Sequence, residues 1–509
     1  MELADIKNSF KWNMLLLPVI TAVGLVTNVF LARQLSLSTY AVFMILMSFK
    51  STFLGAADLG MSTSYTKFYY EVHHKNGQPG AVHFTAQILG LKALVLTGLL
   101  VLLIVFHDIA VDYFKLESVP SSGLLLVVSL IVLEAVSNAF ERYLEVNLRQ
   151  KSLNTIKLLQ LTTFIVMLAL FARLGELSIS SALYSLVAST ALKAAALLAV
   201  FYRQTEGGRT GAILGWLRQN VGRFIKTSAT IYFDKMSSTL MNLSFLILII
   251  APHFNKTDVA YLALAGNFVS KTIALLLFPT SGLILPIFSH YYAYKSDSGL
   301  NSAHGYSAKY MGFIFLLSAG LVLTNATQIT MVLYSSRYLP SVVYIMWLLP
   351  IMYIEQAVLN NIAPSFYVKE SYLVYWGNRI IVILGMVGIM GIIRYNAQLT
   401  LLEIVGLFAG LKCLNVCMLL YANTKINKLG FPWMFYAKMI LVVAVSTAAS
   451  YALTANVHNV VAHIAVSTAA YIAVAALGMR LVSLVDEADW QTLSDVGLPF
   501  VKQARWILG

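Results

Sequence analysis

Long apolar stretches alternate with short polar ones from one end of the chain to the other. An apolar stretch of about 20 residues can cross a hydrocarbon core ~30 Å thick as an α-helix. The pattern therefore predicts an all-α, polytopic membrane protein with about 14 transmembrane helices. These are expected near residues 12–33, 38–60, 81–106, 121–142, 153–173, 178–201, 226–250, 258–288, 308–333, 341–366, 371–393, 398–420, 434–454 and 460–482.

The composition agrees with this class. Apolar residues make up 59% of the 509 residues and charged residues 11%, whereas soluble domains have about 25% charged residues. No polar segment is long enough to hold a soluble catalytic domain. The two cysteines, Cys413 and Cys417, supply too few ligands for a metal site. The sequence thus predicts neither an enzyme nor a metal or cofactor site.

The net charge of +13 could by itself indicate a nucleic acid or anionic lipids as partner. Its distribution decides between them, because 22 of the 35 Lys and Arg residues lie in the polar segments on one side of the predicted spans and six on the other. Segments rich in Lys and Arg stay in the cytoplasm. We therefore expect both termini to be cytoplasmic, with membrane lipids and no nucleic acid as partners.

A repeat relates the second predicted span to the eighth. Tyr40 is followed ten residues later by Lys50, and Tyr261 is followed ten residues later by Lys271. Because these spans are six apart, the two halves keep one orientation, and we expect two pseudo-symmetric six-helix lobes plus two C-terminal helices. The expected parts are an N-terminal lobe at 1–205, a cytoplasmic linker at 206–225, a C-terminal lobe at 226–421, two further spans within 422–482 and a cytoplasmic tail at 483–509.

The repeat places Lys50 and Lys271 near the bilayer midplane, because ten residues of helix extend ~15 Å from a tyrosine at the membrane interface. A lysine at that depth costs on the order of 2.5–3.5 kcal/mol. One explanation is pairing with a carboxylate, for which Asp58, eight residues after Lys50, is a candidate. The explanation that we favour is that both lysines line a hydrated cavity and bind an anionic cargo.

Other charges inside the spans complete the candidate site. Arg379 suits phosphate oxygens, although an ion pair with Glu355 on the preceding span is the simpler expectation. The predicted substrate-binding residues are Lys50, Lys271, Arg379 and Lys235, and the predicted charge partners or coupling residues are Asp58, Glu355 and Asp234. The residues expected mainly to hold the bundle together are Lys92, Glu134, Lys193, Glu403 and Lys412.

Two segments resemble those of a known family. GAADLGMSTSYTKFYYE at 55–71 and LILPIFSHYYA at 283–293 resemble segments of polysaccharide transporters of the multidrug/oligosaccharidyl-lipid/polysaccharide (MOP) flippase superfamily. The resemblance implies a Wzx-type flippase of the bacterial inner membrane. Such proteins move undecaprenyl-diphosphate-linked oligosaccharide repeat units for surface or exopolysaccharide synthesis, by alternating access of two lobes around a cationic cavity. The chain departs from many relatives at Asn242, near which they carry an acidic residue, so an ion-coupling site is not carried over.

Other functions remain open at this stage. A multidrug or cation antiporter of the same superfamily would need carboxylates in its cavity, whereas the charges near the midplane are mainly basic. A lipid II flippase is a third possibility, and a polysaccharide polymerase or ligase would be expected to have a large, basic outer loop. The expected partners are a lipid-linked anionic glycan and membrane lipids, with a polysaccharide polymerase or glycosyltransferases as further candidates.

Overall fold

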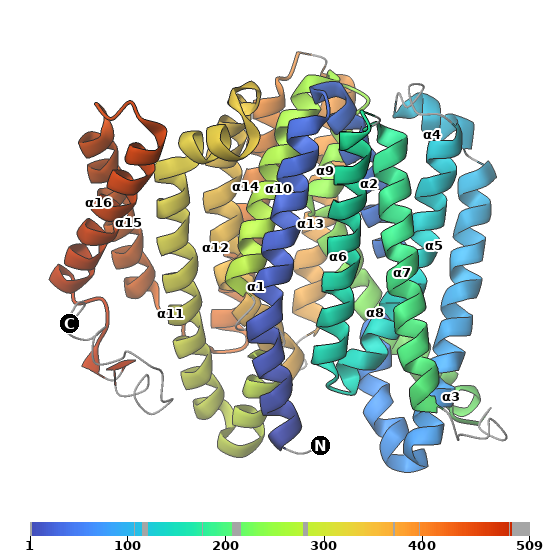
Figure 1. Ribbon diagram of the computed structural model, residues 1–509. Coiled ribbons are helices and arrows are strands. Elements are labelled where there is room, and N and C mark those ends of the chain that lie inside the picture. The colour runs from blue at the N-terminus through green and yellow to red at the C-terminus, as the bar shows by residue number, and fades with distance from the viewer. Residues whose placement is uncertain are drawn as a thin grey trace. The chain divides into compact units, whose positions relative to one another are not determined.

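The computed structural model describes residues 3–105, 107–114, 121–175, 177–205, 215–277, 284–369, 372–396, 398–487 and 489–490. Within these ranges every regular element is a helix (Figure 1). Thirteen of the described helices are long and apolar enough to cross a membrane, and one bent pair makes a fourteenth candidate. The predicted all-α class and the predicted number of spans are therefore confirmed.

The helices are α1 (Leu3–Gln34), α2 (Leu37–Ala57), α3 (Met61–Val105), α4 (His107–Tyr113), α5 (Ser121–Val146), α6 (Gln150–Arg173), α7 (Ile179–Thr205), α8 (Gly215–Leu240), α9 (Leu243–Ile250), α10 (Lys256–Leu277), α11 (Ile284–Tyr334), the 3-10 helix η1 (Ser336–Tyr338), α12 (Ser341–Val368), α13 (Tyr372–Tyr395), α14 (Leu401–Lys425), α15 (Trp433–Thr454) and α16 (Val460–Leu481). The eighth span is predicted to reach residue 288, but α10 ends at Leu277. The linker predicted at 206–225 lies outside the described residues as far as 214, and from Gly215 onward it forms the start of α8.

By packing, the chain divides into two compact units, residues 1–263 with 386–397, and residues 264–385 with 398–509. In the first unit α5 packs on α3 and α7, and α1 packs on α6. The α2 helix of this unit contacts α5, α8 and α9, so its side chains meet neighbours on several sides. In the second unit α11 packs on α12, α15 and α16, and α12 packs on α14.

Two breaks in the helices shape the first unit. The α3 helix turns back at Gly77, whose φ of 66° lies in the left-handed region that glycine tolerates, and its two arms meet there (Figure 1). The α8 and α9 helices meet at an angle of 57°. Between them Asn242 caps α9, because its side chain accepts a hydrogen bond from the Ser244 N–H at 3.1 Å. These breaks bring the second arm of α3 and the end of α8 back toward α2.

The corner between α2 and α3 holds α8 at very short range. Leu59 and Gly60 have φ values of 45° and 71°, so the chain reverses within the Asp58-Leu59-Gly60 sequence. A Cβ atom added to Gly60 would lie 2.3 Å from the Ser228 carbonyl oxygen and 2.8 Å from the Tyr232 nitrogen, both in the backbone of α8. The corner therefore needs glycine for its dihedral angle and for its contact with α8.

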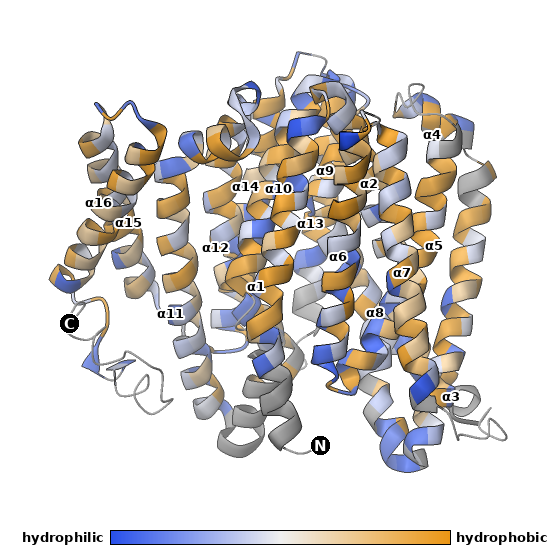
Figure 2. Cartoon of the chain, in the orientation of Figure 1, coloured by the Kyte–Doolittle hydropathy of each residue, from blue (hydrophilic) through white to orange (hydrophobic). Residues whose placement is uncertain are grey.

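The surfaces of the helices fit a lipid environment. Hydrophobic residues dominate the helix bodies, and hydrophilic residues gather toward their ends (Figure 2). Large apolar side chains such as Leu94, Val105 and Val461 are about 70% exposed, which would be unfavourable for a patch of this kind in water. Together with the spans, this surface identifies a multi-pass membrane protein.

In the second unit, the described beginning of the predicted tail packs on α11, whereas residues 491–509 lie outside the described residues. The Lys309 ammonium contacts Asp486 at 3.2 Å and Asp489 at 2.9 Å, and Trp490 is buried. Desolvation acts to raise the pKa of Asp486, but the Asp489 backbone N–H and the Lys309 ammonium together lower it. The start of the tail is thus held by charge and by an aromatic side chain.

We predict that Gly60→Ala lowers the stability of the protein by about 2 kcal/mol or more, because the new methyl group meets backbone atoms and the left-handed angle is strained. Thermal unfolding in detergent measures this change. Gly90→Ala is the matched control, because nothing lies within 4 Å of a Cβ atom at that position of α3. Equal unfolding temperatures for the two variants would contradict the close contact between the corner and α8.

Candidate cationic site

Asp58 is the centre of a charged cluster that joins α2, α3 and α8. Its Oδ1 accepts hydrogen bonds from the Lys92 ammonium at 3.0 Å and from the Ser62 hydroxyl. Its Oδ2 accepts a hydrogen bond from the Lys235 ammonium at 2.6 Å. Lys92 also donates to the Ser62 hydroxyl at 2.7 Å. Because the Asp58 side chain is only 11% exposed, two ammonium groups share one largely buried carboxylate.

The local fold explains how residues so far apart in sequence meet. Asp58 follows the last residue of α2, and Ser62 lies in the first turn of α3. The turn at Gly77 brings the second arm of α3, with Lys92, back beside the first arm. The contact of Gly60 with α8 places Lys235 next to the same corner.

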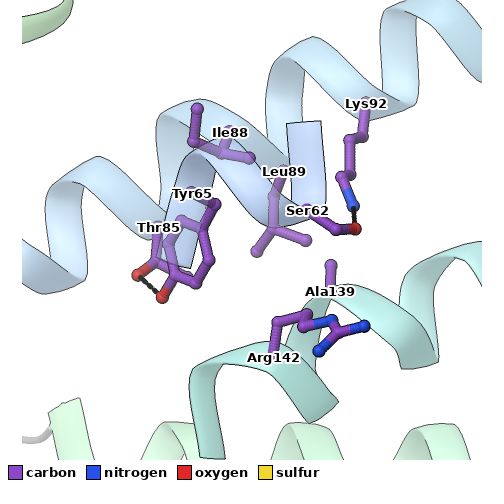
Figure 3. A pocket seen from close by; sticks show the side chains of 8 residues that line it. All are labelled: Ser62, Tyr65, Thr85, Ile88, Leu89, Lys92, Ala139 and Arg142. Atoms are coloured by element: carbon purple, nitrogen blue, oxygen red, sulfur yellow. Dashed lines mark hydrogen bonds between the residues drawn. The ribbon is translucent and has the colours of Figure 1, made fainter. Parts of the chain in front are cut away.

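A small pocket lies beside this cluster. It is lined by Ser62, Tyr65, Thr85, Ile88, Leu89, Lys92, Ala139 and Arg142 (Figure 3). The Tyr65 and Thr85 hydroxyls are 2.8 Å apart. The Arg142 guanidinium comes from α5 and contacts Glu145 at 2.6 Å. Arg142 and Lys235 both repel the positive charge of Lys92. The pocket thus presents hydroxyl groups and cations, which are groups suited to an anion.

Lys50 pairs with Glu134 of α5, and not with Asp58, which the sequence offered as a candidate partner. Its Nζ lies 2.6 Å from Glu134 Oε2, so the two side chains form a close ion pair. The side chains of Lys50 and Glu134 are 16% and 22% exposed. Both oxygens of Asp58 instead have lysine partners from α3 and α8.

A second shared carboxylate holds the helices of the first unit together. Glu141 of α5 contacts Lys157 of α6 at 2.8 Å and Lys193 of α7 at 3.0 Å. Lys193 is buried, and the Glu141 side chain is 12% exposed. This cluster connects three helices and lies outside the lining of the pocket described above.

The second unit contains a more deeply buried one-to-one pair. The Lys412 ammonium of α14 donates to Glu355 of α12 at 2.6 Å, and both side chains are 5% exposed. Arg379 of α13 is also buried, next to Asn378, whose amide donates to Asn415 at 2.7 Å. The predicted ion pair between Glu355 and Arg379 stays a prediction.

The remaining predicted site residues have partly exposed side chains. Lys271 lies in the second half of α10, and Asp234 immediately precedes Lys235 on α8. The structure thus brings Lys235 and Asp58 together directly in the first unit. Lys50 lies on α2, whose last residue, Ala57, immediately precedes Asp58.

The residues expected to hold the bundle together do so in four of five cases. Glu134, Lys193 and Lys412 each take part in an ion pair between two helices, and Lys92 of α3 pairs with Asp58 at the end of α2. Glu403 instead belongs to a capping box at the start of α14, where its carboxylate accepts from the Thr400 N–H at 2.7 Å. Among the described residues, no group of three His, Cys, Asp or Glu side chains is placed to hold a metal ion.

Near Gly77, Glu71 provides another connection between α3 and α8. Its carboxylate contacts Lys75 at 3.2 Å on its own helix and Arg223 of α8 at 3.1 Å. Slight burial acts to raise the pKa of Glu71, but the hydrogen bond from Lys75 and the charge of Arg223 lower it. The start of α8 is therefore held on α3 by a charged contact as well as by the corner at Gly60.

Sequence reasoning missed Glu141 and did not assign Arg142 to the site. Both lie at the end of the predicted fourth span, where a charged residue can equally be assigned to the cytoplasmic segment that follows. One signal in the sequence was the excess of basic over acidic residues inside the predicted spans, which a carboxylate shared by two lysines accommodates.

Comparison with known proteins comes from sequence and from structure. The sequence profile of the family described as "Polysaccharide biosynthesis protein" matches residues 8–292, which is more than half of the chain. No curated protein has a sequence that matches the chain.

Several solved structures have a similar fold. The lipid II flippase MurJ, in an inward closed conformation, has a TM-score of 0.67 at 15% identity, over 92% of this chain and 98% of the other. An inward-facing multidrug resistance MATE transporter of the MOP superfamily has a TM-score of 0.59 at 12% identity, over 84% and 95%. A MOP superfamily transporter from Pyrococcus furiosus, described as having a binding pocket of reverse polarity, has a TM-score of 0.58 at 14% identity, over 82% and 96%. At these identities the likeness shows the fold alone.

We predict that Glu355→Gln lowers stability by about 3–5 kcal/mol, because it leaves the Lys412 ammonium buried without its partner. The double variant Glu355→Gln/Lys412→Met should recover most of this loss in thermal unfolding. Glu145→Gln is the control, because it breaks a more exposed pair with Arg142 and should cost less than about 1 kcal/mol. A double variant no more stable than Glu355→Gln would contradict the structural role of this pair.

Proposed function

The chain belongs to the polysaccharide biosynthesis protein family, as the motifs at 55–71 and 283–293 predict, and we propose that it is a flippase for undecaprenyl-diphosphate-linked oligosaccharides. In this proposal it works in the bacterial inner membrane with both termini in the cytoplasm. The substrate is a repeat unit for surface or exopolysaccharide synthesis. The protein changes the leaflet in which the substrate lies and makes or breaks no covalent bond.

The observation that carries the proposal is the positive charge around Asp58. One carboxylate faces two lysines there, so the cluster carries one positive charge more than it can neutralise itself. A lipid diphosphate carries two or more negative charges, which cannot enter hydrocarbon without compensation. The excess positive charge would supply that compensation while the glycan passes.

The same charges argue against a carrier of cationic drugs. Such a carrier needs a carboxylate that can accept the cation of the drug. Each of four carboxylates in the described helix bodies or at their ends already lies within 3.0 Å of a lysine ammonium, namely Asp58, Glu134, Glu141 and Glu355. An anionic substrate therefore fits these paired carboxylates and their lysines better than a cationic one.

Exposure ranks the proposed substrate contacts. Lys235 is 36% exposed and Lys50 16%, so these two are assigned the first contacts with the diphosphate. Lys271, with a partly exposed side chain, is the counterpart in the second half of the repeat. Arg379 is only 5% exposed, so we assign it a contact only after a conformational change.

The transport cycle follows from the repeat and from the energetics of release. We infer alternating access of the lobes predicted at 1–205 and 226–421, in which the cationic site opens to one leaflet and then to the other. Binding has to stay moderate, because the diphosphate must also leave. Ion pairs within the protein can compete with the substrate, and Asp234 is proposed to act in this way, whereas the buried Glu355 is proposed to stay paired with Lys412. A polymerase or glycosyltransferases are proposed as partners that consume or supply the glycan.

We predict that Lys50→Ala, Lys235→Ala and Lys271→Ala each reduce export of the lipid-linked glycan about tenfold in a complementation assay, with normal protein levels in the membrane. Lys→Arg should retain more activity than Lys→Gln at each position, because the role of the side chain is its charge. Lys425→Ala at the exposed end of α14 is the control and should export normally. The proposal would be contradicted if the three alanine variants exported the glycan fully. It would also be contradicted if the unmodified protein instead rescued a strain that lacks lipid II transport.

A further inference from the structure

The two lysines that share Asp58 are not equivalent. Lys92 has two acceptors, the Asp58 carboxylate at 3.0 Å and the Ser62 hydroxyl at 2.7 Å, and its side chain is 14% exposed. Lys235 donates only to Asp58 among the described residues, and its side chain is 36% exposed. Lys235 is therefore the lysine that can be withdrawn from the cluster.

Withdrawing Lys235 leaves no group stranded. Asp58 would keep its ion pair with Lys92 and its hydrogen bond from Ser62, so no buried carboxylate would lose all its partners. The two ammonium groups also repel each other, and this repulsion would be relieved. In a one-to-one pair such as Glu355 and Lys412, the same exchange would leave one charge buried and unpaired.

We propose that Asp58 is an internal counter-ion, which holds Lys235 in place of the substrate and releases it to an incoming diphosphate. This inference rests on the proposed function and deepens it. Asp58 is then a positioning residue and does not touch the substrate. In the absence of substrate its carboxylate keeps Lys235 and Lys92 together at the corner between α2 and α3.

The same exchange provides for release. When the substrate has moved, the Asp58 carboxylate is still beside Lys92 and competes for the Lys235 ammonium. A site without Asp58 would hold the diphosphate more tightly and let it go more slowly. The counter-ion thus lowers affinity and raises turnover, which is the opposite of what a residue that binds substrate does.

The test compares binding of farnesyl diphosphate, with farnesol as the uncharged probe, to the purified full-length protein in detergent. For Asp58→Asn we expect the dissociation constant of farnesyl diphosphate to fall about tenfold, while farnesol binding is unchanged. Glu141→Gln is the matched control, because Glu141 also holds two lysines, at 2.8 and 3.0 Å, but outside the pocket lining. The Glu141→Gln variant should bind farnesyl diphosphate with the same dissociation constant as the unmodified protein.

Two further measurements separate this role from a structural one. In proteoliposomes, Asp58→Asn should translocate a fluorescent polyprenyl-diphosphate glycan at a lower maximal rate and with a lower half-saturating concentration. In the double variant Asp58→Asn/Lys235→Ala the gain in affinity should disappear, because the group released by Asp58 is no longer present. A variant that is merely misfolded would lose affinity and rate together.

The outcomes are distinguishable. If the unmodified protein does not prefer farnesyl diphosphate to farnesol, the proposed function fails. If it does, but Asp58→Asn binds farnesyl diphosphate no more tightly, the counter-ion role is overturned. Should Asp58→Asn fail to fold, Asp58→Asn/Lys92→Gln removes one charge of each sign and still frees Lys235. That variant must then bind the probe more tightly than Lys92→Gln alone, and equal affinities would overturn the inference.

Discussion

A carboxylate shared between two lysines is the constraint on which the first unit of this protein depends. Asp58 sits at a corner whose backbone is fixed by two positive φ angles, and from there it binds the second arm of α3 and the end of α8. The steric contact of Gly60 with α8 and the ion pair of Asp58 with Lys235 act on the same helix. Packing and charge therefore both fix α8 at this corner. A change in the ion pair between Asp58 and Lys235 also acts on the position of α8.

Largely buried charges occur in two kinds of cluster among the described residues. In the first unit, Asp58 and Glu141 each hold two lysines, so one partner can leave without stranding a charge. In the second unit, Glu355 and Lys412 form a one-to-one pair, and both side chains are only 5% exposed. Removing one partner of a buried one-to-one pair is costly, whereas a shared carboxylate tolerates the exchange of one of its two lysines. We therefore connect exchange with the substrate to the first kind of cluster and rigidity to the second.

The fold followed from the sequence because the bilayer imposes a simple rule on it. Hydrocarbon leaves the backbone no partner but itself, so each apolar stretch of sufficient length forms a helix, and the spans could be counted. Pairing between charges was harder to predict. Lys50 and Asp58 lie on one helix eight residues apart, yet Lys50 meets Glu134, and Asp58 meets residues 34 and 177 positions away along the chain. The two partners of Asp58 depend on the turn at Gly77 and on the contact of Gly60 with α8, which periodicity does not encode.

The most direct test of the account is an experimental structure of the full-length protein with a lipid diphosphate bound. The account predicts that the Lys235 ammonium lies ~2.8 Å from a diphosphate oxygen and has left Asp58, while Lys92 remains on Asp58 and Ser62. A bound diphosphate held elsewhere, with Lys235 still paired to Asp58, would contradict it.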